Sequence, residues 1–150
     1  MSTLKNILLV EDDPKDVELM REALYENHLV NDLIVVHDGE QALDYLYRRG
    51  KFAERNQIEP AVILLDLKLP KMDGLEVLAT VKNDPALHLI PIVMMTSSRE
   101  ESDLVRSYEL GVNAYVVKPV DFEQFVTAVR QLGIFWAILN ERPKTQFLQV

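Results

Sequence analysis

The chain has 150 residues, a formal net charge of −8 and no cysteine. This acidic balance argues against a nucleic-acid surface, because phosphate backbones attract Lys and Arg, and the lack of cysteine excludes disulfides, a thiol nucleophile and a Cys-rich zinc site. The length suits one domain, and without a long apolar segment we expect a cytoplasmic protein that contacts no membrane.

The first apolar run, residues 6–10, precedes a helical pattern over 14–27, for which Asp13 is the expected N-cap and Pro14 the first helical residue. The same alternation then repeats. Further apolar runs occupy 33–36, 61–66, 91–97 and 114–119, and helical patterns occupy 39–49, 74–84, 99–111 and 121–131. Gly111 and Asp121 are stop and start signals. The longest connection, 48–60, is polar and has room for one helical turn.

The apolar runs are rich in Val, Ile and Leu and mostly do not alternate with polar residues, which is typical of strands buried on both faces of a parallel sheet. Strands that alternate with helices predict a doubly wound α/β fold with a five-stranded parallel sheet flanked by five helices. We expect residues 1–142 to form one domain and 143–150 a tail.

Unusual polar residues follow four of these strands. Glu11 and Asp12 end the first strand, Asp66 the third, Thr96 the fourth and Lys118 the fifth. In open α/β sheets, ligands bind outside the carboxyl ends of the strands. Three carboxylates, a hydroxyl and an ammonium there predict a hard-cation site, with Mg²⁺ as the expected ion, beside a place for a phosphoryl group.

The segments "VEDD", "LLDLKLPKMDG", "MMTS" and "VVKP" together resemble the receiver domain of two-component response regulators, of the single-domain CheY-like type, over about residues 5–132. The resemblance implies the flavodoxin-like strand order 2-1-3-4-5. It also implies the site residues: Asp66 as phospho-acceptor, Mg²⁺ held by Glu11, Asp12, Asp66 and the main-chain carbonyl of Lys68, Thr96 and Lys118 on the phosphoryl group, and Thr96 with Tyr115 as the switch pair.

The resemblance further implies a protein that is not an enzyme in its own right but accepts a phosphoryl group from a sensor histidine kinase. It would signal by repacking the face of the fourth helix, fifth strand and fifth helix, and its output would pass to a downstream protein or phosphotransfer partner. The loop 48–60 and the segment "FWAILNERP" look like the small regulators paired with bacteriophytochrome-type histidine kinases.

Three other functions share parts of this pattern. A haloacid-dehalogenase-type phosphatase needs a second Asp two residues after the nucleophile, where this chain has Lys68. A flavodoxin-like FMN site needs hydroxyl groups after the first strand, where carboxylates would repel phosphate. A degenerate receiver that signals without phosphorylation is the serious alternative, although such domains normally lack a key residue and this chain lacks none.

Beyond the receiver pattern, an apolar stripe continues along the C-terminal segment to Leu139, and Ile134, Phe135 and Ile138 fall away from it on a helical wheel. We expect an extended last helix and a homodimer formed through the fourth helix, the fifth strand and this extended helix, with these three side chains at the interface. The alternative is that the segment folds back onto its own domain.

Overall fold

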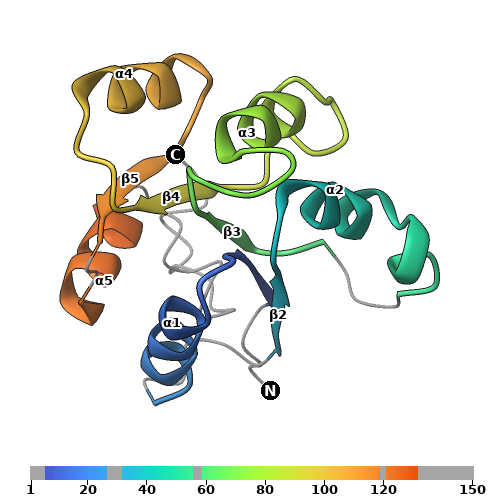
Figure 1. Cartoon of the computed structure of the whole chain (residues 1–150), viewed down its shortest axis with the longest axis horizontal. Helices are drawn as coiled ribbons and strands as arrows, with labels where there is room; N and C mark the ends of the chain where they lie inside the picture. The colour runs from blue at the N-terminus through green and yellow to red at the C-terminus, as the bar shows by residue number, and fades with distance from the viewer. Residues whose placement is uncertain (1–5, 27–31, 56–58, 119–120, 132–150) are drawn as a thin grey trace, which may run out of the picture.

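The computed structural model of the protein describes residues 6–26, 32–55, 59–118 and 121–131 (Figure 1). The strands are β1 (Asn6–Val10), β2 (Asp32–Val36), β3 (Val62–Leu65), β4 (Ile92–Thr96) and β5 (Ala114–Val117). The helices are α1 (Pro14–Glu26), α2 (Gly39–Tyr47), α3 (Gly74–Lys82), α4 (Glu101–Glu109) and α5 (Phe122–Gln131), with a 3₁₀ turn η1 (Gly50–Phe52) after α2.

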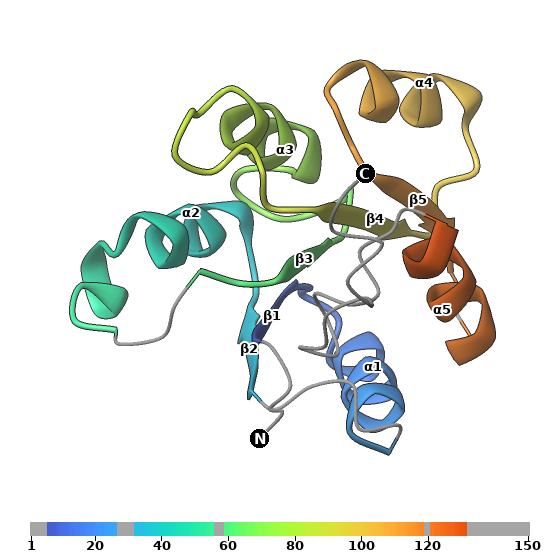
Figure 2. The same ribbon diagram turned by 180° about the vertical axis from the view of Figure 1, so that it is seen from behind.

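The five strands are all parallel, in the order β2-β1-β3-β4-β5, so the predicted fold class and strand order are confirmed. Helices α2, α3 and α4 cover one face of the sheet, and α1 and α5 cover the other, as the two views show (Figures 1 and 2). Successive strand side chains point to opposite faces. In β1, Leu8 and Val10 therefore join the core beneath α2 and α3, while Ile7 and Leu9 join the core beneath α1 and α5.

The predicted helix signals are confirmed where α1, α4 and α5 begin or end. The side chain of Asp13 accepts the Lys15 N–H at 2.9 Å, and that of Asp121 accepts the Gln124 N–H at 2.7 Å. Gly111, just past α4, has a φ of +100°, which favours glycine. Helix α2 ends two residues before the predicted boundary, because Arg48 takes a left-handed conformation and caps it.

Helix α4 is the most lightly anchored of the helices whose side chains are fully described. Its only buried residue is Ser107, while Leu104, Val105 and Tyr108 are large apolar or aromatic side chains exposed on its surface. A helix with so little buried surface can shift at low free-energy cost.

The described residues end at Gln131, so the predicted extension of the last helix, the tail 143–150 and the expected dimer residues Ile134, Phe135 and Ile138 lie outside them. In the part of the chain that is described, no helix is both long and apolar enough to cross a bilayer.

Candidate functional site

The register of the central strands places Glu11 and Asp66 side by side. Val10 pairs with Leu65, so the next residue of each strand lies just beyond the carboxyl end of the sheet. The Asp66 N–H donates to the Val10 carbonyl at 3.1 Å, and the Glu11 N–H donates to the Val36 carbonyl at 2.9 Å. Both acidic residues are thus held by main-chain bonds that continue the sheet, and their positions are fixed by the fold.

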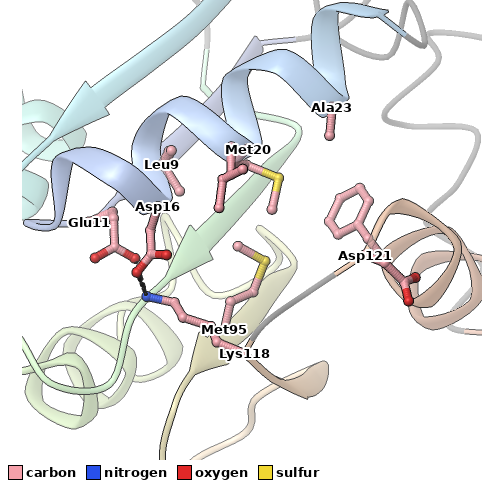
Figure 3. Close-up of a pocket in the computed structure, with 10 residues that line it drawn as sticks. Leu9, Glu11, Asp16, Met20, Ala23, Met95, Lys118 and Asp121 are labelled. Atoms are coloured by element: carbon pink, nitrogen blue, oxygen red, sulfur yellow. Dashed lines mark hydrogen bonds and ion pairs between the residues drawn. The ribbon is translucent and has the colours of Figure 1, made fainter.

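Lys118 reaches these two carboxylates from the end of β5, an edge strand of the sheet. Its N–H donates to the Thr96 carbonyl at 2.8 Å, directly after the paired residues Thr96 and Val117. Its ammonium group donates to Glu11 Oε1 at 2.5 Å and to Asp66 Oδ2 at 3.0 Å. A third bond, to Asp16 Oδ2 on α1, is 2.9 Å long (Figure 3). The three N–H donors of the lysine therefore each have a carboxylate partner.

The carboxylates outnumber the ammonium groups at this site. Oxygen atoms of Glu11, Asp12 and Asp66 lie within 4.8 Å of one another; Glu11 and Asp66 are buried and Asp12 is exposed. Buried carboxylates that share one lysine retain excess negative charge, which is costly in a poorly solvated place. Three clustered carboxylates are also the oxygen ligands that a hard divalent cation prefers. The donor set therefore fits such a cation, as the sequence predicts.

Burial raises the pKa of the Glu11 carboxyl to about 7, although the hydrogen bonds from Lys118 and from the Asp13 N–H act in the opposite direction. For Lys118, burial lowers the pKa, but the hydrogen bonds to Glu11, Asp16 and Asp66 outweigh it and the net pKa is raised. Lys118 is therefore a permanent cation at neutral pH.

The loop from Asp66 to α3 is held by a close approach of two backbone segments. A Cβ atom on Gly74 would lie 2.2 Å from the Asp66 carbonyl oxygen and 2.8 Å from the Leu67 Cα. The Asp73 side chain caps α3 by accepting the Glu76 N–H at 3.0 Å. Lys68 points its side chain into solvent, and its N–H donates to Asp66 Oδ1 at 3.3 Å. Only the main chain of Lys68 is therefore placed to serve the site.

The two predicted switch residues meet at the loop between β4 and α4. Thr96 is fully buried, and its hydroxyl oxygen accepts the Ser98 N–H at 3.3 Å. The half-buried Tyr115 donates its hydroxyl to the Ser98 carbonyl, also at 3.3 Å. A movement of Thr96 would therefore shift Ser98 and, with it, the carbonyl group to which Tyr115 is bonded.

Sequence reasoning did not identify two acidic residues that belong to this region. Asp16 contacts Lys118 from the first turn of α1, and Asp103 on α4 accepts the Ser98 hydroxyl at 2.6 Å and lies 3.8 Å from the Lys68 ammonium group. A weak hint existed for Asp16, because it lies in the first turn of the helix that follows the strand end carrying Glu11 and Asp12. No comparable signal marks Asp103.

The chain is similar to known proteins in sequence and in fold. Residues 7–130 match the family model described as response regulator receiver domain. The chain is 42% identical over 132 residues to the response regulator Rcp1 of Synechocystis sp., which covers 88% of each chain. The solved bacteriophytochrome response regulator RtBRR is 62% identical, with a TM-score of 0.81 over 97% of this chain and 88% of that one.

Two further solved relatives contain a bound metal ion or a phosphoryl group. The Mn²⁺-bound form of Rcp1 has a TM-score of 0.74 at 41% identity, and the phosphorylated cyanobacterial phytochrome response regulator RcpA has 0.75 at 41%. Each match covers 89% of this chain and 94% of the other.

Proposed function

The chain belongs to the response regulator receiver domain family, and from this premise we propose that it takes a phosphoryl group onto Asp66 from the phosphohistidine of a sensor kinase. The observation that carries the proposal is the Lys118 ammonium group, bonded at 3.0 Å to a buried aspartate beside two more carboxylates. A lysine that stays protonated at that distance can interact with the carboxylate before the transfer and with the oxygens of the incoming phosphoryl group during it.

The transfer needs only one nucleophile. A carboxylate oxygen of Asp66 forms the new bond to phosphorus, the phosphorus–nitrogen bond of the donor breaks, and its electron pair returns to the imidazole of the kinase. Lys118 hydrogen-bonds the phosphoryl oxygens, and we place the Thr96 hydroxyl as a second donor to them. The chain is the acceptor in this reaction and supplies no further catalytic step of its own.

We assign Mg²⁺ to Glu11, Asp12, Asp66 and the main-chain carbonyl of Lys68. Bound there, a divalent cation offsets the charge of the carboxylates and of the phosphoryl group. The Mn²⁺-bound form of the relative Rcp1 supports a divalent ion in this kind of domain.

The kinase partner we propose is of the bacteriophytochrome type. The 62% identity to the bacteriophytochrome response regulator RtBRR supports it, as does the similarity to the phytochrome response regulator RcpA. The output then passes to a downstream protein or to a phosphotransfer partner.

Phosphorylation is tested by intact mass after incubation with Mg²⁺ and acetyl phosphate. We expect one added phosphoryl group on the wild type, removable by hydroxylamine, and none on Asp66→Asn, which keeps the shape of the side chain but is not a comparable nucleophile. A folded wild type that gains no group under these conditions, or from a kinase, would favour a degenerate receiver instead. Equal labelling of the two proteins would remove Asp66 from the proposal.

The metal assignment is tested with Asp12→Ala. Because Asp12 is exposed and close to two other carboxylates, its removal should not lower the metal-free melting temperature, and relief of repulsion should hold or raise it. The rise in melting temperature on adding Mg²⁺ should shrink by more than half. Glu22→Gln, an exposed change of equal charge on α1, is the control and should keep the full rise. If Asp12→Ala keeps it too, Asp12 is not a ligand.

For signalling, we propose that phosphorylation draws Thr96 toward the phosphoryl group and that Tyr115 follows it inward. The pair is already connected through Ser98, and α4 buries little surface, so this face can adopt a second packing. The change is a population shift between two arrangements of α4, β5 and α5.

We further propose that residues 1–142 form one receiver domain with an extended last helix, and that it dimerises through this face together with Ile134, Phe135 and Ile138. Sedimentation equilibrium should give a dimer for the wild type and a monomer for Phe135→Asp/Ile138→Asp. The dimer affinity should change with phosphodonor in the wild type and stay constant in Tyr115→Ala, which should still be labelled. A wild type that stays monomeric at high micromolar concentration in both states would contradict the dimer.

A further inference from the structure

Asp16 stands apart from the other acidic residues at the site. It comes from the third residue of α1 rather than from a strand end, and its side chain is 32% exposed, against 3% for Glu11 and 10% for Asp66. It does not belong to the group of carboxylates whose oxygens lie within 4.8 Å of one another. Asp16 is therefore part of the lysine's surroundings but not of the cation's.

The surroundings of Lys118 give Asp16 a particular importance. A cavity of about 70 Å³ lies beside the lysine, between α1 and α5, and its walls include Leu9, Met20, Met95 and Phe125 (Figure 3). Glu11 and Asp16 lie at the same end of this cavity as the ammonium group. An ammonium group has no partner among aliphatic and thioether side chains, so on the α1 side the carboxylate of Asp16 is what keeps it in place.

The other two partners of Lys118 have a second task under the proposed function, on which this inference rests. Glu11 and Asp66 are assigned to the cation, and Asp66 is also the residue that is modified. Their oxygens are then turned to other partners, while Asp16 keeps its bond of 2.9 Å to Lys118.

We propose that Asp16 is a positioning residue for phosphoryl transfer: it holds the Lys118 ammonium group over Asp66 while Glu11 and Asp66 engage the cation and the phosphoryl group. One N–H donor of the lysine stays on Asp16, and two remain for phosphoryl oxygens. The side chain of Lys118 is flexible, and fixing its end in advance lowers the ordering cost of the transfer.

The test compares labelling by acetyl phosphate in wild type, Asp16→Asn, Asp16→Ala and the control Glu18→Gln, which removes one charge from the exposed face of the same helix. Loss of a hydrogen bond to a charged group predicts labelling about tenfold slower in Asp16→Ala. Asp16→Asn keeps an acceptor oxygen, so its labelling rate should fall between those of the wild type and Asp16→Ala. The Mg²⁺ concentration that gives half of the thermal stabilisation should stay within about twofold of wild type in all four proteins, since Asp16 is not a ligand.

A double-mutant cycle separates positioning from a general structural role. In the Lys118→Ala background, Asp16→Ala should slow labelling no further, because Asp16 acts only through the lysine. An equal loss in both backgrounds would overturn the proposal, and so would labelling of Asp16→Ala at the wild-type rate or faster, since a faster rate would mean that Asp16 competes with the phosphoryl group for Lys118. A wild type that is not labelled at all would instead contradict the proposed function itself.

Discussion

Lys118→Ala is expected to label with phosphodonor at least a hundredfold more slowly than the wild type, because it removes the one cation that is bonded to Asp66 within the described residues. The same change should destabilise the metal-free protein. Removing one partner of a buried ion pair leaves the other charged groups uncompensated, at a typical cost of about 3 kcal/mol. Here those groups are Glu11 and Asp66, both buried.

Mg²⁺ distinguishes the two effects. The cation can neutralise the carboxylates that Lys118 no longer reaches, so it should raise the melting temperature of Lys118→Ala at least as much as that of the wild type. Labelling should stay slow even when Mg²⁺ is saturating. Lys15→Ala, an exposed lysine on α1, is the control and should match the wild type in both measurements. Normal labelling of Lys118→Ala would refute the role given to this lysine.

Gly74→Ala is expected to lower the free energy of unfolding by about 3 kcal/mol, at the upper end of the usual cost of overpacking. The added methyl group would meet the Asp66 carbonyl oxygen at 2.2 Å and the Leu67 Cα at 2.8 Å. Both are backbone atoms fixed by the sheet and by the start of α3, so no flexible side chain can move aside. The loop itself must shift, and Asp66 with it, so labelling should also slow.

Urea unfolding measures the first effect, with Gly50→Ala as the matched control. Gly50 has a φ of +56°, but the nearest atom to an added Cβ is the Asp44 carboxylate oxygen at 3.6 Å. Its replacement should therefore cost only about 1 kcal/mol of backbone strain. If Gly74→Ala is no less stable than Gly50→Ala, the close approach does not hold the loop.

Much of the fold follows from local patterns. The apolar runs predict strands buried on both faces, which holds for β1, β3 and β4, while the edge strands β2 and β5 are only partly buried. Residues such as Asp13, Asp121 and Gly111 mark helix ends by chemistry that acts within a few residues. The strand ends then bring Glu11, Asp66 and Lys118 together, since parallel strands end at the same edge of the sheet. For these residues, sequence order and sheet topology are sufficient.

The parts that were not predicted depend on how helices and loops pack, which local sequence patterns do not specify. The bond of Asp16 to Lys118 joins residues 102 apart in the chain and depends on how α1 packs on the sheet. The Ser98–Asp103–Lys68 group depends likewise on where a lightly packed α4 settles. The Gly74 contact is of the same kind, because "MDG" indicates a turn but does not reveal which backbone atoms it approaches.

The most direct measurement locates the phosphoryl group on the chain. Borohydride reduces an aspartyl phosphate to homoserine, which tandem mass spectrometry of peptides can assign to one position. After treatment with Mg²⁺ and acetyl phosphate, we expect homoserine at position 66 and unmodified aspartate at positions 12, 13 and 16. Homoserine at any of those three positions with intact Asp66, or a labelled protein without homoserine, would contradict phosphorylation of Asp66.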